Sequence, residues 1–325
     1  MSQPAVTAQN LAVDYAAAAA TLLGPARKIR AVEGVSFAIA KGETLGLVGE
    51  SGSGKSTVGR AILRRTPLAE GRVLLDGEDI THTRGRALQR LRGKMQLVLQ
   101  DPYASLNPRM RVAEIVAEPL IVHRRVKSRA EANARVADIL RLVGLPDDAH
   151  ARFPHAFSGG QRQRIGIARA LALEPQLIVA DEPVSALDVS VRAQVINLMQ
   201  DLQERLGLSY LFIAHDLAIV RHISHRIAIL YAGRLVEIAA RDAIYTAPRH
   251  PYTEALLAAV PVADPSVVRA ERDHGAAPAE LPDLANPPPG CLYAMRCPLA
   301  TDQCRREAPP LTEKAPGHLA ACWHR

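Results

Sequence analysis

The chain has 325 residues, of which 48% are hydrophobic, and a formal net charge of +7 at pH 7. This length accommodates one large domain and an appendage; no run approaches the roughly 20 apolar residues of a transmembrane helix, and the N-terminus lacks a signal-peptide pattern. Aromatic residues make up only 4% and none interleaves with the basic residues at 83–94, so the charge indicates a solvated basic face, or attraction to anionic lipid, rather than nucleic-acid binding.

A strand-loop-helix pattern near the N-terminus is the first chemical signal. Strands are predicted at 9–14 and 32–39, where they would form a β-rich edge, and again at 43–49, and TVGRAILRR at 57–65 predicts a helix. Between them, GESGSGKST (49–57) has the spacing GxxxxGKS. Such a loop binds phosphate through backbone N–H groups and the positive end of the helix dipole.

This loop predicts a nucleotide site, because an ordinary glycine-rich turn would not need a strand before it and a helix after it. Lys55 would reach the β- and γ-phosphates, and Ser56 would ligate Mg²⁺. The expected contacts are Gly49, Ser51, Gly52, Ser53, Gly54, Lys55, Ser56 and Thr57.

A mostly helical insert is predicted at about 105–158, where apolar residues of 131–145 recur at helical spacing. FSGGQ at 157–161 then opens another helical run, with Ser158 as a suitable N-cap. By itself this motif also fits a simple capped turn. A second glycine-preceded helix N-terminus is nevertheless a second potential phosphate site, formed by Ser158, Gly159, Gly160 and Gln161.

Two adjacent carboxylates follow the short apolar run LIVA at 177–180. The run predicts a buried parallel strand that delivers the acids at its C-terminal end, although a solvated acidic turn is the alternative. Asp181 would hold Mg²⁺, and Glu182 would polarise the attacking water as a general base. The parallel core is expected to end near Val236.

The last part of the chain combines a Pro-rich stretch at 261–290, expected to be a linker, with all of the cysteines. These are Cys291, Cys297, Cys304 and Cys322. Their spacing lacks the CxxC pairs of common zinc sites, and a reducing cytoplasm disfavours disulfides. The residues alone leave open zinc, another metal, or four unrelated thiols.

The order of these motifs resembles the ATP-binding-cassette (ABC) ATPases over residues 8–260. The phosphate loop is similar to the family's Walker A motif, FSGGQ to its signature motif, and the paired acids to its Walker B motif. Single positions also match: Tyr15 resembles the adenine-stacking aromatic, Gln100 the Q-loop glutamine, Asp188 the end of the D-loop, and His215 the switch histidine.

The resemblance implies an α/β P-loop nucleotide-binding domain at 1–260, with a parallel sheet core, an antiparallel β edge and a helical subdomain. Residues 261–290 would be the linker and 291–325 a small four-Cys region. ATP and Mg²⁺ would be the cofactors. Mg²⁺ would be held by Ser56, Gln100 and Asp181, and hydrolysis would use Glu182, His215, Gln100 and Lys55. Two subunits would close head to tail, with Ser158 and Gly160 of one facing the phosphate loop of the other.

Longer stretches at 99–110, 152–203 and 249–261 resemble the F-type ATPase subunit of oligopeptide/dipeptide importers. This implies an ATPase that powers peptide import at the cytoplasmic face of the inner membrane. The implied partners are a second, non-identical ATPase subunit, two transmembrane permease subunits and an extracytoplasmic substrate-binding protein, with no nucleic acid. An importer for nickel or another small solute is the alternative. A soluble non-transport clamp is disfavoured because coiled-coil arms and a second cassette are lacking, and an inactive subunit because every catalytic position is filled.

The segments GCLYAMRCPLA (290–300) and HLAACW (318–323) resemble the C-terminal region of peptide-importer ATPases, where some members hold a [4Fe–4S] cluster with four cysteines. The resemblance therefore implies a cluster at the four cysteines. We expect this site to be separate from the ATP site, because the Pro-rich linker lies between them in the sequence.

Overall fold

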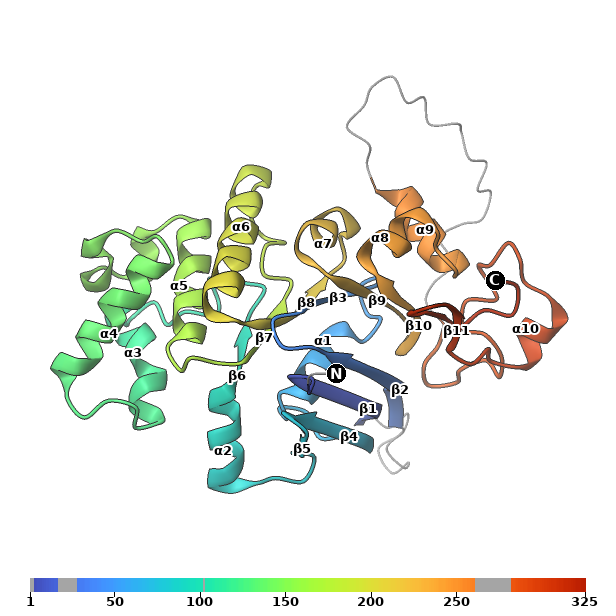
Figure 1. Cartoon of the computed structure of the whole chain (residues 1–325), viewed down its shortest axis with the longest axis horizontal. Helices are drawn as coiled ribbons and strands as arrows, with labels where there is room; N and C mark the ends of the chain where they lie inside the picture. The colour runs from blue at the N-terminus through green and yellow to red at the C-terminus, as the bar shows by residue number, and fades with distance from the viewer. Residues whose placement is uncertain (1–2, 17–27, 102, 261–281) are drawn as a thin grey trace, which may run out of the picture.

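The computed structural model describes residues 3–16, 28–101, 103–260 and 282–325, and two sheets organise them (Figure 1). The smaller sheet is antiparallel, in the order β2-β1-β4-β5. Its strands are β1 (Val6–Ala16), β2 (Lys28–Ile39), β4 (Glu70–Leu75) and β5 (Glu78–Asp79). This is the β-rich edge expected from the sequence, with β1 and β2 longer than predicted.

The larger sheet has eight described strands in the order β11-β12-β10-β9-β3-β8-β7-β6. The run from β9 to β6 is parallel, and β10, β12 and β11 continue it antiparallel. The strands are β3 (Thr44–Val48), β6 (Met95–Val98), β7 (Leu177–Asp181), β8 (Ser209–Ala214), β9 (Arg226–Tyr231), β10 (Arg234–Ala240), β11 (Thr312–Ala315) and β12 (His318–Ala320).

The helices cover the larger sheet and form a separate group at one end of the molecule, around α3, α4 and α5 (Figure 1). None of the helices in the described ranges is both long and apolar enough to cross a bilayer. They are α1 (Lys55–Ile62), α2 (Gly85–Lys94), α3 (Val112–Val122), α4 (Arg129–Leu142), α5 (Gly159–Leu171), α6 (Val189–Leu206), α7 (Leu217–Ile223), α8 (Arg241–Thr246), α9 (Pro251–Ala259) and α10 (Asp302–Arg306), with 3₁₀ turns at Asp147–Ala151 and Pro154–Ala156. The stretch predicted as a helical insert thus contains α3, α4 and both 3₁₀ turns.

Side chains of the central strands alternate between two cores. In β8, Tyr210 and Phe212 pack with the residues of α3 to α6, whereas Leu211 and Ile213 pack with α1 and the smaller sheet. Because successive side chains of a strand point to opposite faces, a strand covered on both faces must be apolar throughout. This explains why the central strands read as continuous apolar runs.

The strand order brings four loops to one edge of the sheet. Strands β3, β8, β7 and β6 are parallel neighbours, with Val48 opposite Ala214 and Val98 opposite Ala180. The loops after their carboxyl ends are therefore adjacent, which is where open α/β sheets bind ligands.

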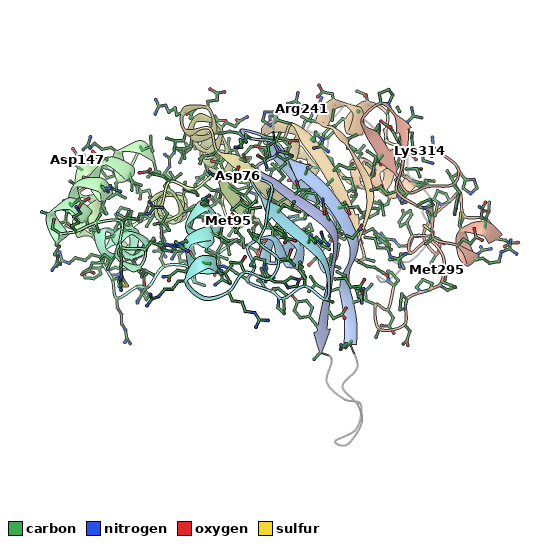
Figure 2. The ribbon with its side chains drawn as sticks, turned by 60° about the horizontal axis from the view of Figure 1, so that its bottom comes forward. Asp76, Met95, Asp147, Arg241, Met295 and Lys314 are labelled. Carbon is green, nitrogen blue, oxygen red and sulfur yellow. The ribbon has the colours of Figure 1, made fainter. Side chains whose placement is uncertain are left out.

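The C-terminal residues extend the larger sheet: Glu237 of β10 pairs with Ala320 of β12, and β11 pairs with β12. Figure 2 shows this end of the molecule, with Lys314 and Met295 labelled. The four-Cys region is thus joined to the larger sheet by backbone hydrogen bonds. Most of the predicted linker, 261–281, lies outside the described residues.

Candidate functional site

The glycine-rich loop that was predicted to bind phosphate, here called the phosphate loop, connects β3 to α1, and two of its glycines are required by close backbone contacts. A Cβ on Gly49 would lie 2.1 Å from the carbonyl oxygen of Leu230. Gly54 has φ +100°, and a Cβ there would lie 2.7 Å from the carbonyl oxygen of Ala31. A side chain at either position would force the backbone to move, so the loop shape depends on glycine.

Lys55 is almost completely buried at the centre of this loop. Its Nζ donates to the carbonyl oxygens of Gly49 and Glu50, each at 2.8 Å. Burial lowers the pKa of Lys55, and the carboxylates of Glu182 and Asp181 oppose that shift. A phosphate anion beside Nζ would compensate the burial of this charge.

The remaining loop residues separate into an exposed tip and a buried base. Ser51 and Gly52 are exposed, whereas Ser53 is completely buried. Within the described part of the chain, Ser53 Oγ has no hydrogen-bond partner. A buried hydroxyl without a partner in a glycine-rich loop is consistent with a polar ligand that binds there.

Two predicted Mg²⁺ ligands meet across the sheet edge. Ser56 Oγ, at the start of α1, donates to Asp181 Oδ1, at the end of β7, over 2.7 Å. Asp181 is buried, and burial raises its pKa while the bond from Ser56 opposes the shift. A hydroxyl and a carboxylate are the hard oxygen ligands that Mg²⁺ takes. Gln100, the third predicted ligand, is exposed just after β6.

Glu182 and His215 form the second polar pair of the edge. His215 Nδ1 lies 3.3 Å from Glu182 Oε2, and the side chains are 56% and 18% exposed, respectively. Glu182 has φ +48°, and its N–H donates to the carbonyl oxygen of Ile213 at 3.0 Å. A non-glycine residue held in this left-handed region costs energy, and such strain clusters at functional sites.

Tyr15 lies at the end of β1 and is 40% exposed. Its hydroxyl is 3.3 Å from Thr57 Oγ1, so the ring is beside the helix that follows the phosphate loop. An exposed ring at this place is available to stack on a nucleotide base.

The signature residues form a helix start elsewhere in the chain. Ser158 caps α5, and a reciprocal pair of bonds joins it to Gln161, at 3.1 and 3.4 Å. A Cβ on Gly160 would lie 2.3 Å from Val191 Cγ1, so α5 and α6 are closely packed there. Ser158 and Asp188 are both exposed. In the ranges that the structure describes, no hydrogen bond or ion pair joins residues 158–161 to the phosphate loop.

Two residues that were not predicted as site residues contact the loop. Arg296 forms two bonds with the carboxylate of Glu50, both at 2.9 Å, and Tyr252 Oη accepts from the N–H of Glu50 at 2.9 Å. The expectation that the four-Cys region is separate from the predicted ATP site is therefore wrong, because Arg296 of that region binds Glu50 of the phosphate loop. A separation of 246 positions left no spacing signal for this contact.

The four cysteines, together with His324, line one small cavity. Cys304 Sγ lies 3.4 Å from His324 Nε2. Burial raises the pKa of Cys291 and of Cys297, and the neighbouring thiols add to both shifts. Nevertheless, no group of three His, Cys, Asp or Glu side chains in the described ranges has a metal-binding arrangement. The thiols are brought together, but the expected iron–sulfur site is not shown.

Comparison with known proteins identifies two matching families. The family model for ABC transporters matches residues 32–185, and the model for the oligopeptide/dipeptide transporter C-terminal region matches residues 236–304. The oligopeptide transport ATP-binding protein AppF of Bacillus subtilis is 50% identical over 295 residues, covering 90% of this chain and 89% of AppF.

Solved structures of ATP-binding cassettes also match this chain. The ATP-binding cassette MJ0796, in a dimeric post-hydrolysis state bound to ADP and Pi, has a TM-score of 0.64 and 31% identity, covering 73% of this chain and 98% of that one. Another dimeric structure of MJ0796, described as a bacterial ABC transporter cassette, has a TM-score of 0.64 and 30% identity over the same shares.

Proposed function

The chain belongs to the ABC transporter family of ATP-binding proteins, and on that premise we propose that it hydrolyses ATP to power the import of peptides. One observation carries the chemistry: the phosphate loop, the Ser56–Asp181 pair and the Glu182–His215 pair lie at the same edge of the sheet. The match of residues 236–304 to the oligopeptide/dipeptide C-terminal family supports a peptide cargo.

The loop residues fit a nucleotide triphosphate with Mg²⁺. Lys55 and the loop N–H groups would bind the β- and γ-phosphates, and Tyr15 would stack on the base. Ser56, Asp181 and Gln100 would hold Mg²⁺. When bound, the ion neutralises charge that develops on the phosphate oxygens.

Glu182 is the proposed general base. Its carboxylate would accept a proton from water as the water oxygen bonds to the γ-phosphorus and the bond from phosphorus to the ADP oxygen breaks. His215, 3.3 Å from Glu182, would orient this carboxylate and contact the γ-phosphate. The strained backbone at Glu182 fixes the direction of the side chain before the substrate arrives.

We propose that the complete site needs a second ATPase subunit. Ser158, Gly159, Gly160 and Gln161 form a helix start whose cap, Ser158, is exposed, and in the described ranges no hydrogen bond joins these residues to their own phosphate loop. A group that serves another subunit's nucleotide would have this arrangement. Asp188, at the start of α6, would lie at the same subunit interface. The partner subunit is expected to be non-identical.

The remaining partners are two transmembrane permease subunits and an extracytoplasmic substrate-binding protein, which place the chain at the cytoplasmic face of the membrane. The helical group around α3 and α4 would contact the permeases, with Gln100 coupling it to the ATP site. Peptide specificity would depend on the binding protein and the pore.

The four cysteines are proposed to hold a [4Fe–4S] cluster. Four thiols around one cavity are the ligand set that such a cluster takes. Anaerobic purification should yield a brown protein with about four iron atoms per chain. A preparation that contains zinc would instead assign a zinc site, and a colourless, metal-free one would contradict any metal.

Co-expression with the neighbouring genes tests the function. The chain should co-purify with two multi-spanning membrane proteins, and a binding protein loaded from a casein digest should stimulate ATP hydrolysis. Stimulation by nickel but not by peptides would overturn the peptide assignment, and purification without membrane proteins would indicate a non-transport clamp.

A further inference from the structure

A bidentate ion pair joins the four-Cys region to the phosphate-binding loop. Arg296 Nη1 and Nη2 donate to Glu50 Oε2 and Oε1, both at 2.9 Å. The two side chains are 25% and 31% exposed, so the pair is partly shielded from water. The bonds to Glu50 raise the pKa of Arg296 above its ordinary value. Paired, parallel bonds of this kind fix geometry as well as energy.

The backbone of Glu50 is held from the same side. Its N–H donates to Tyr252 Oη, and the ring of Tyr252, completely buried, packs against Tyr231 at 4.6 Å and Tyr293 at 5.3 Å between ring centroids. In the sequence, Tyr293 stands between Cys291 and Cys297. The guanidinium of Arg296 is 5.7 Å from the centre of the Tyr293 ring. The cluster of Tyr231, Tyr252 and Tyr293 thus contacts the Glu50 backbone through Tyr252 and supports Arg296, which binds the carboxylate.

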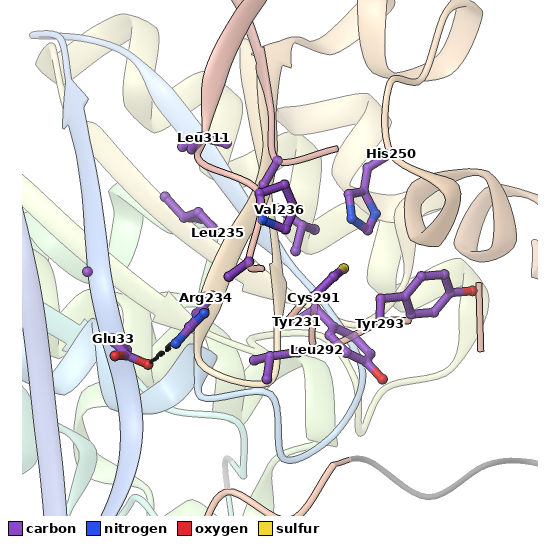
Figure 3. A pocket seen from close by; sticks show the side chains of 14 residues that line it. Glu33, Tyr231, Arg234, Leu235, Val236, His250, Cys291, Leu292, Tyr293 and Leu311 are labelled. Carbon is purple, nitrogen blue, oxygen red and sulfur yellow. Dashed lines mark hydrogen bonds and ion pairs between the residues drawn. The ribbon is translucent and has the colours of Figure 1, made fainter. Parts of the chain in front are cut away.

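The aromatic cluster of Tyr231, Tyr252 and Tyr293 packs against the nucleotide-binding domain. Figure 3 shows Cys291, Leu292 and Tyr293 in the same pocket as Tyr231, Val236 and His250, and the Arg234–Glu33 ion pair at its other side. The segment that carries Arg296 is therefore part of the wall beside β9 and β10.

The position of Glu50 matters for the nucleotide because Lys55 donates to its carbonyl oxygen. A change in the loop at residue 50 would move the lysine that reaches the phosphates. An unpaired carboxylate at this position would also repel the triphosphate, and Arg296 neutralises that charge.

We propose that Arg296 is a positioning residue of the ATP site, through which the four-Cys region holds the phosphate loop in its binding conformation. The inference rests on the proposed ATP-hydrolysing function. It assigns to the C-terminal region a direct effect on nucleotide affinity rather than a role in protein stability alone.

The test compares Arg296→Gln with Arg325→Gln in the assembled complex. Arg325 is a matched control because it joins the same C-terminal region to α9 through Glu254 at 2.9 Å, and among the described residues it has no hydrogen bond or ion pair to the loop. The dissociation constant and KM for ATP should rise about tenfold in Arg296→Gln, the size of a lost close charge pair, with a smaller change in kcat. Arg325→Gln should bind ATP like the wild type.

A double-mutant cycle measures the interaction between Arg296 and Glu50. In a Glu50→Gln background, Arg296→Gln should have little further effect, because no unpaired carboxylate remains. Arg296→Lys, which keeps the charge but not the two parallel bonds, should be intermediate, and it replaces Arg296→Gln if that variant does not fold.

Wild-type ATP affinity in Arg296→Gln, additive effects in the cycle, or an equal loss in Arg325→Gln would overturn the proposal. Absence of ATP turnover in the wild-type complex would instead contradict the proposed function, so the two failures are distinguishable.

Discussion

Glu182→Gln tests the assignment of the general base with the smallest structural change. Glutamine has the same shape, and its amide oxygen can keep the contact now made 3.3 Å from His215 Nδ1. The backbone at this position has φ +48°, which costs glutamine about as much as glutamate. Folding stability should therefore change by no more than about 0.5 kcal/mol.

The expected loss is in kcat. Removing a positioned general base costs about 10²- to 10⁴-fold, or roughly 3 to 5 kcal/mol of barrier. ATP affinity should be retained, because Lys55, Ser56 and Asp181 are untouched. Steady-state ATPase activity of the assembled complex and equilibrium nucleotide binding measure the two quantities. Turnover within a fewfold of the wild type would refute the role of Glu182.

Three further predictions concern other parts of the chain. Burial raises the pKa of Asp181, so at pH 7 the ionised carboxylate destabilises the folded state. Asp181→Asn should therefore raise the melting temperature of the nucleotide-free protein at pH 7 while weakening Mg²⁺-dependent ATP binding. A lower melting temperature would contradict this. Ser158→Arg should leave nucleotide binding by the single chain intact but abolish hydrolysis in the complex; normal complex activity would exclude the composite site. Burial lowers the pKa of His250 to about 4 from 6.5, so stability is lost as the pH falls through this window; thermal melts at pH 7 and 5 should show a smaller loss for His250→Asn, which keeps an acceptor at the cap of α9.

The residues that the structure brings to one edge of the sheet could be picked out from the sequence because each motif has a local signature. A strand, a glycine loop and a helix are adjacent in the chain, and the glycine at residue 49 is required by backbone contact. Asp181 ends and Glu182 follows strand β7, whose other residues are all apolar because both faces of the strand are covered. Parallel pairing then brings these separate motifs to one edge, as expected for an α/β sheet.

The C-terminal region was predicted less well, because its position depends on contacts between distant residues. Pairing of β12 with β10 and the bonds between Arg296 and Glu50 have no periodic signal in the sequence. The proline-rich composition before Cys291 predicts no helix or strand, and none is present at 282–290. It does not predict which part of the domain the residues after 290 contact. The ligand of the cysteines is likewise not determined by their spacing.

Peptide-dependent ATP hydrolysis by the complete transporter tests the central claim most directly. The chain would be reconstituted in proteoliposomes with its second ATPase subunit, both permeases and the binding protein, and phosphate release would be followed with and without a casein digest. The account predicts hydrolysis that peptides stimulate and that Glu182→Gln removes. Hydrolysis that is insensitive to peptides, or unchanged by Glu182→Gln, would contradict it.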